Sequence, residues 1–164
     1  MPDRSPDLLR WRHIAEPADP GKISALVAGT GVFSAEEARV AGELATSTLD
    51  GSETYRFLFA EEPGGALLGF TCFDRIPLSK VSFDLYWIAV SADRQGTGLA
   101  GELIARTARF AKAKRGLWLF AETSSREPYA RARAFYQGVG FTEVARFEDF
   151  YAPGDAKVIF RLKL

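Results

Sequence analysis

Apolar positions follow a helical spacing in four segments of the chain. After Ser34, apolar side chains recur every three or four residues as far as Leu49, and Ser34 with Glu37 has the form of a capping box. Asp19 followed by Pro20 predicts an N-cap and a proline at the first helical position. The expected helices therefore cover residues 19–29, 35–49, 99–116 and 127–137.

The other apolar runs are short and predict strands. Glu61-Glu-Pro-Gly-Gly65 has the composition of a hairpin loop and separates two such runs. Residues 81–90 are mostly apolar, as in a strand covered on both faces, and the helix between them and the next run predicts a parallel pair. The expected strands cover residues 9–14, 56–60, 66–74, 81–90, 117–121, 142–150 and 156–164.

This order of elements predicts one α+β domain over residues 9–164, after a polar tail at residues 1–8. A length of 164 residues suits one domain better than two. No run approaches the roughly 20 apolar residues of a membrane span, and the start lacks the apolar segment of a signal peptide. We therefore expect a cytoplasmic protein without a membrane partner.

The charge balance and the number of possible metal ligands exclude some classes of function. Basic and acidic residues number 21 each, so nucleic acid is not an expected partner. The first 82 residues hold 8 basic and 12 acidic residues and the last 82 hold 13 and 9, so an anion is expected in the second half. With His13 and Cys72 as its single histidine and cysteine, the chain cannot form a His/Cys zinc site, and no metal is expected.

A glycine-rich segment connects the strand at 81–90 to the next helix. Gly96, Gly98 and Gly101 allow the backbone to come close to a ligand, and their N–H groups lie at the positive end of a helix dipole. The segment therefore predicts a phosphate site, although a plain strand-to-helix turn would also use glycines.

The same glycines match the dinucleotide fingerprint Gly-x-Gly-x-x-Gly, with Glu122 about 20 residues further on. Residues 91–95 separate the strand from the first glycine, however, and the chain offers one clear β-α-β crossover where a dinucleotide fold repeats it. A P-loop is excluded, because no Gly-Lys-Ser or Gly-Lys-Thr follows.

Three segments resemble the GNAT acyltransferases, which move an acetyl group from acetyl-coenzyme A to an amine. Gln95-Gly-Thr-Gly-Leu-Ala100 fits the family's (Gln/Arg)-x-x-Gly-x-(Gly/Ala) signature, and Leu85–Val90 is similar to its fourth strand. Ala134-Phe-Tyr-Gln-Gly-Val-Gly-Phe141 resembles its Phe-Tyr-x-x-x-Gly-Phe segment. The resemblance implies the GNAT fold, with a mixed sheet of about seven strands and about four helices.

The resemblance also implies acetyl-coenzyme A as the cosubstrate and a primary amine of a small molecule or a peptide N-terminus as the acceptor. The enzyme would be a monomer or homodimer. The backbone N–H groups near Ile88 to Val90 would stabilise the oxyanion. The residues implied to bind the cosubstrate are Ile88, Ala89, Val90, Gln95, Gly96, Thr97, Gly98, Leu99, Ala100 and Gly101.

Acetyl transfer to an amine needs a base for the amine proton and an acid for the leaving sulfur. The resemblance implies Tyr136 as the acid. Glu122 is the first candidate for the base and Asp84 the second, with a water molecule as a further possibility. Candidate acceptor-binding residues are Phe33, Asp84, Phe150 and Tyr151. The alternative functions are a non-catalytic acyl-coenzyme A sensor and a nicotinamide-dependent oxidoreductase.

Overall fold

The computed structural model describes residues 8–164, which divide into two compact units. Unit 1 holds the described residues up to Phe73 together with Trp87–Thr107, and unit 2 holds Asp74–Tyr86 and Ala108–Leu164. The expected tail at residues 1–8 lies, apart from Leu8, outside the described residues.

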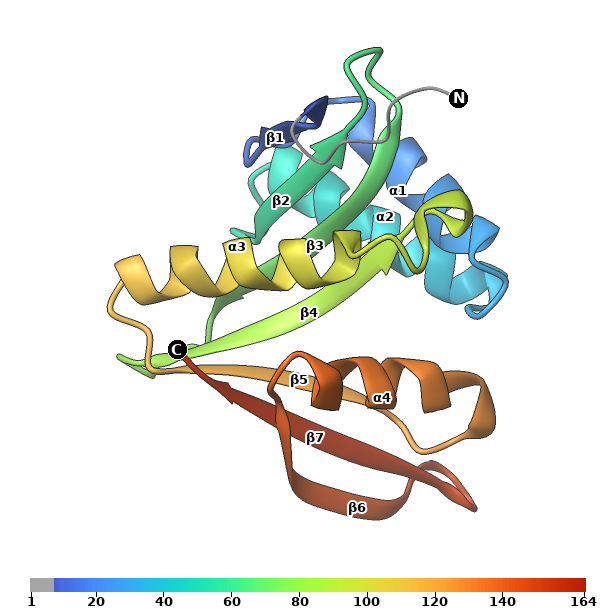
Figure 1. Cartoon of the computed structure of the whole chain (residues 1–164), viewed down its shortest axis with the longest axis vertical. Coiled ribbons are helices and arrows are strands. Elements are labelled where there is room, and N and C mark those ends of the chain that lie inside the picture. Colours follow the sequence, from blue (N-terminus) through green and yellow to red (C-terminus); the bar gives the residue numbers. More distant parts are fainter. Residues whose placement is uncertain (1–7) are drawn as a thin grey trace. The chain divides into compact units, whose positions relative to one another are not determined.

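Unit 1 contains two consecutive helices and three antiparallel strands (Figure 1). The predicted capping box is confirmed: the Glu37 N–H donates to Ser34 Oγ at 3.1 Å, and the Ser34 N–H donates to Glu37 Oε2 at 2.6 Å. The elements are β1 (Arg10–Arg12), α1 (Asp19–Gly29), α2 (Ala35–Leu49), β2 (Arg56–Glu61) and β3 (Leu67–Arg75).

The hydrophobic core of unit 1 lies between its two helices and its strands. Helices α1 and α2 pack against each other. Of the apolar stripe predicted for α2, Ala41 and Ala45 are buried, whereas Val40 and Leu49 are exposed. Cys72, on β3, is buried in this core. The buried cluster comprises Ile23, Leu26, Val27, Ala38, Ala41, Ala45, Phe57, Phe59, Phe70, Cys72 and Ala89.

The predicted role of Asp19 as a helix N-cap is wrong. The N-cap is Ala18, and the Asp19 side chain, which is fully buried, accepts two hydrogen bonds from Arg12 at 2.5 and 2.8 Å. Arg12 also donates to Glu61 at 2.6 Å. A buried carboxylate needs a cationic partner, so this ion cluster, which ties β1 to α1 and β2, takes precedence over capping.

Unit 2 contains a parallel strand pair and a closing hairpin. The strand Ser82–Val90 (β4) pairs in parallel with Trp118–Ser124 (β5), from Ser82 opposite Trp118 to Leu85 opposite Ala121, as the crossover predicted. The helix that connects them is α3 (Leu99–Ala113); residues of β4 and α3 belong to both units. The further elements are α4 (Ala130–Gly138), β6 (Thr142–Ala152) and β7 (Asp155–Lys163), with α4 drawn alongside β7 in Figure 1.

Two strands of unit 2 are longer than predicted. Strand β5 continues to Ser124 because it pairs with β7 as far as Ser124 opposite Lys157, so Glu122 lies inside the strand and not at its end. Strand β6 continues to Ala152, which leaves a shorter turn around Gly154. Pairing with a distant strand sets both ends, and the local sequence does not contain that information.

Together the strands form a seven-stranded mixed sheet in the order β1-β2-β3-β4-β5-β7-β6. Four α-helices accompany this sheet in the part of the chain that the structure describes, which confirms the α+β class. None of the helices in residues 8–164 is long and apolar enough to span a bilayer.

Candidate active site

The loop after β4 in unit 1 leaves its backbone open to a ligand. Gly96 and Gly98 have φ angles of +75° and +88°, which L side chains rarely adopt. A Cβ built on either glycine would meet nothing within 4 Å, so these glycines are not needed for packing against the protein. Residues from Gln95 to Gly98 are exposed, and α3 begins directly afterwards at Leu99.

The first turn of α3 adds hydrogen-bond donors to this loop. The Glu102 N–H donates a helical hydrogen bond to Gly98 O at 3.1 Å, at the start of α3. The N–H groups of Leu99, Ala100 and Gly101 precede it and have no carbonyl partner within the helix. They lie at the positive end of the helix dipole, so the segment fits a phosphate group.

Side-chain bonds hold the loop in place. Arg94, in the short 3-10 helix Ala92–Arg94, donates to Glu62 at 2.8 Å, and Thr97 Oγ1 donates to Arg94 O at 2.5 Å. Arg106 on α3 donates to Glu102 at 2.7 Å. Because both arginines already have carboxylate partners, we attribute anion binding here chiefly to the backbone.

The end of β4 in unit 1 approaches β3 closely. A Cβ on Gly69 would lie 3.1 Å from Ala89 O, so a larger residue at that position of β3 would require its neighbours to shift by a few tenths of an ångström. Ala89 and Val90 are buried, and Ile88 is partly buried. The three residues implied to supply the oxyanion donor thus lie on a tightly packed strand end.

Trp87 contacts Phe33, one of the predicted acceptor-binding residues, with 5.3 Å between the two ring centroids. Both side chains pack against the core of unit 1. The Trp87 Nε1 is buried without a hydrogen-bond partner within residues 8–164, which is energetically costly. The sequence analysis did not identify this contact.

Unit 2 has a pocket of about 210 Å³ in which two carboxylates meet apolar side chains. The register of β4 and β5 places Asp84 opposite Phe120, and Glu122 is the first residue of β5 after the last parallel pair. Burial raises the pKa of Asp84, and the negative charge of Glu122 raises it further. The lining residues are Ile76, Asp84, Leu85, Tyr86, Phe120, Ala121, Glu122 and Ile159.

A lysine pairs with the predicted base. Lys157 Nζ on β7 lies 2.7 Å from Glu122 Oε2 and 4.6 Å from the centroid of the Phe150 ring. The hydrogen bond to Glu122 raises the pKa of Lys157. An alternating strand pattern predicts only that such a lysine faces away from the core, so the sequence carried no sign of this pair.

The two aromatic residues predicted for the acceptor site belong to the same surroundings. The Phe150 and Tyr151 rings contact each other at 5.0 Å. Burial and the charge of Glu122 raise the pKa of Tyr151. The structure thus groups Phe150 and Tyr151 with Asp84 and Glu122 in unit 2, whereas Phe33 belongs to unit 1.

Tyr136 on α4 is buried in unit 2, with 7% of its surface exposed. Its ring contacts those of Phe141 at 5.2 Å and Phe160 at 5.5 Å. Burial raises the pKa of Tyr136 well above its usual value, so the hydroxyl keeps its proton at neutral pH. The side chain therefore has the protonation state that a general acid needs.

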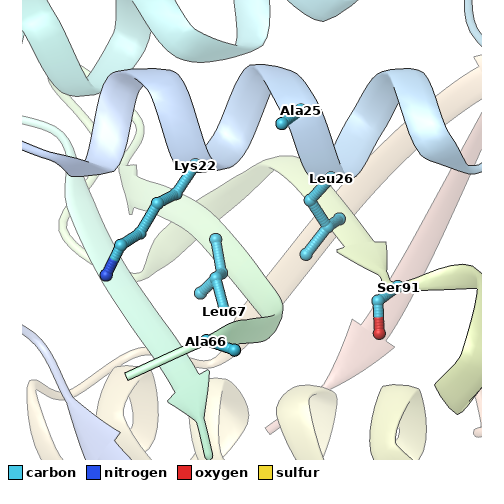
Figure 2. A pocket seen from close by; sticks show the side chains of 6 residues that line it. All are labelled: Lys22, Ala25, Leu26, Ala66, Leu67 and Ser91. Carbon is cyan, nitrogen blue, oxygen red and sulfur yellow. The ribbon is translucent and has the colours of Figure 1, made fainter. Parts of the chain in front are cut away.

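A further pocket, of about 350 Å³, lies in unit 1 between α1 and the start of β3 (Figure 2). Leu26 and Leu67 point into it, while the Lys22 ammonium turns aside and donates to Gly65 O at 3.0 Å. The pocket holds no base or acid suited to amine chemistry. Its lining residues are Lys22, Ala25, Leu26, Ala66, Leu67 and Ser91.

Comparisons with known proteins agree with the fold. A structure of a GNAT-family protein from Desulfovibrio desulfuricans is 38% identical, with a TM-score of 0.91, and the match covers 94% of this chain and 98% of that one. The ribosomal-protein-S18-alanine N-acetyltransferase of Escherichia coli is 19% identical, with a TM-score of 0.72 and coverage of 94% and 93%. The latter likeness shows the fold alone.

An acetyl-coenzyme A complex of a streptothricin acetyltransferase candidate from Bacillus anthracis is 17% identical, with a TM-score of 0.60 and coverage of 68% and 64%. A search of curated proteins found no match. The family model of the acetyltransferase (GNAT) domain matches residues 53–143, more than half of the chain. The chain therefore belongs to the GNAT acetyltransferase family and is an acetyl-coenzyme A-dependent N-acetyltransferase.

Proposed function

We propose that this enzyme transfers the acetyl group directly from acetyl-coenzyme A to a primary amine of a small molecule or a peptide. The observation that carries the proposal is the pocket of unit 2, where Asp84 and Glu122 stand among apolar side chains. Two carboxylates with one nearby lysine favour a cationic ligand, and an amine is protonated at neutral pH.

Glu122 is the proposed base. Its side chain is 54% exposed, so an amine can reach it, and it borders the pocket. One carboxylate oxygen takes the proton of the acceptor ammonium, and the neutral amine then attacks the thioester carbon. Asp84, whose pKa is raised by burial, is the second candidate for this role.

Two other groups complete the proposed reaction. Backbone N–H groups of residues 88–90 stabilise the negative oxygen of the tetrahedral intermediate. As the carbon–sulfur bond breaks, Tyr136 O–H gives its proton to the coenzyme A sulfur. The nitrogen of the intermediate releases its extra proton to solvent, and Tyr136 recovers a proton from solvent. The products are the acetamide and free coenzyme A, and the proton held by Glu122 returns to water.

The loop of unit 1 is proposed to bind the pyrophosphate of coenzyme A. The residues proposed for this role are Gln95, Gly96, Thr97, Gly98, Leu99, Ala100 and Gly101. The open backbone at Gly96 and Gly98 and the N–H groups of the first turn of α3 support this assignment. Because membership of the GNAT family accounts for these glycines, the nicotinamide alternative loses its support.

Gly98→Glu is expected to weaken acetyl-coenzyme A binding by at least about tenfold. The carboxylate would stand beside the phosphates, and the φ of +88° leaves no relaxed conformation for an L residue. Isothermal titration calorimetry measures the affinity. Gly98→Ala introduces the backbone strain without the charge and is expected to bind more tightly than Gly98→Glu; unchanged affinity in Gly98→Glu would contradict the phosphate assignment.

An amine panel tests the proposed function itself. The enzyme is incubated with acetyl-coenzyme A and, separately, aryl-alkyl monoamines, polyamines, amino acids, aminoglycosides and short peptides with free N-termini. Release of coenzyme A thiol and the mass of the amine are both followed. The proposal expects an acetamide in amounts equal to the thiol for at least one class. Thiol release that no amine increases, with no acetylated amine, would overturn it.

A further inference from the structure

Lys157 lies between Glu122, which lines the pocket of unit 2, and Phe150 on β6. Its ammonium contacts Glu122 Oε2 at 2.7 Å on one side and the face of the Phe150 ring at 4.6 Å on the other. The lysine side chain is only 20% exposed, whereas the Glu122 side chain is 54% exposed. The lysine is thus the better fixed member of the ion pair.

A bulge in β6 places Phe150 beneath the lysine. Phe147 pairs with Lys157 and Ala152 with Asp155, so residues 148–151 of β6 stand opposite the single residue 156 of β7. Asp149 takes a φ of +54°, and its carboxylate accepts the Gly154 N–H at 2.7 Å. Bulges of this kind redirect side chains, and this one turns Phe150 toward the ammonium.

Several acidic groups lie near Glu122, and Lys157 opposes their negative charge. Asp84 from β4 and Tyr151 from β6 both interact electrostatically with Glu122, and Asp155 adds its charge near Tyr151. Lys157 is the cation that opposes this negative charge. Two carboxylates that share a pocket repel each other, and one would take up a proton without a compensating cation.

We propose that Lys157 is a positioning residue for acetyl transfer: it fixes the orientation of the Glu122 carboxylate and opposes the negative charge that Glu122 and Asp84 bring to the pocket, with Phe150 holding the lysine in place. The pair uses Oε2, so Oε1 is the oxygen that accepts the proton of the acceptor. The proposal rests on the proposed role of Glu122 as base. Lys157 itself does not contact the reacting atoms.

The test is the dependence of kcat/KM on pH in Lys157→Met. The acidic limb is expected to move to higher pH by about one unit or more, because Glu122 and Asp84 then share the pocket without the cation. The ionisation of the acceptor amine is the same for all variants, so a difference between variants reports on the enzyme. Lys157→Arg keeps the charge and is expected to keep the limb near its wild-type position.

Lys163→Met removes an exposed lysine from the same strand and is the matched control, with no expected movement of the limb. Lys157→Gln provides a second neutral variant if Lys157→Met fails to fold, and its limb is expected to move in the same direction. Activity that falls equally at every pH in the neutral variants, with an unmoved limb, would overturn the positioning role.

Glu122→Gln separates this proposal from the one on which it rests. If Glu122→Gln retains activity and the acidic limb, the assignment of Glu122 as the base fails. If Glu122→Gln loses activity at neutral pH and its remaining activity follows only the ionisation of the amine, while the neutral Lys157 variants keep the limb unmoved, the base assignment stands and only the role of Lys157 is wrong. Thermal unfolding of each variant confirms that it is folded.

Discussion

Tyr136→Phe is expected to lower kcat by about 100-fold or more while leaving the affinity for acetyl-coenzyme A nearly unchanged. The substitution removes the hydroxyl that gives its proton to the departing sulfur. The ring itself stays, so its contacts with Phe141 and Phe160 remain. Steady-state kinetics with the best amine of the panel and calorimetry with acetyl-coenzyme A measure the two quantities.

The pKa of Tyr136 adds a second expectation. Because burial raises that pKa well above 10, Tyr136 stays protonated throughout the neutral and mildly basic range. Ionisation of Tyr136 should therefore cause no loss of wild-type kcat below about pH 10. Up to that pH, kcat of the wild type and of Tyr136→Phe are expected to depend on pH in the same way. Tyr129→Phe, in the 3-10 turn before α4, removes a hydroxyl outside the proposed machinery and is the control. An unchanged kcat in Tyr136→Phe would remove Tyr136 from the mechanism.

Glu122→Gln is expected to reduce kcat/KM at neutral pH by about 10²-fold to 10⁴-fold. Glutamine fills the same space and cannot accept a proton from the acceptor ammonium. Raising the pH should restore part of the activity, because more of the amine is then already neutral. The measurement is kcat/KM over the pH range in which the protein stays folded.

Glu143→Gln is the matched control for this change, because Glu143 is exposed on β6 and lies outside the pocket. Its kcat/KM should equal that of the wild type. If Glu122→Gln keeps wild-type activity, Asp84→Asn is the next variant. A large loss in Asp84→Asn alone would transfer the role of base to Asp84.

Local sequence signals predicted the elements that depend on neighbouring residues. The capping box of Ser34 and Glu37 defined the start of α2, and the order of a strand, a helix and a strand predicted the parallel pairing of β4 with β5. The glycines after β4 predicted an open backbone at the start of α3. Each of these features depends on signals that residues near one another in the sequence provide.

Features that depend on distant residues were missed. Arg12 binds Asp19 and, on another strand, Glu61, which lies 49 residues further along the chain, so Asp19 does not cap α1. Lys157 reaches Glu122 from a strand more than thirty residues away along the chain. The sequence suggested Glu122 as a base. It did not indicate Lys157 as the cationic partner of Glu122, or the bulge in β6 that places Phe150 against this lysine. Pairing registers and buried charge partners appear only once the chain is folded.

Direct transfer is tested most decisively by mixing the enzyme with acetyl-coenzyme A in the absence of any amine. We expect no release of coenzyme A thiol on the time scale of turnover and an unchanged mass of the intact protein, in keeping with the buried position of Cys72. Adding the acceptor amine should then release thiol and acetamide in equal amounts. A burst of thiol equal to the enzyme concentration, with an acetyl group on the protein before the amine is added, would contradict direct transfer.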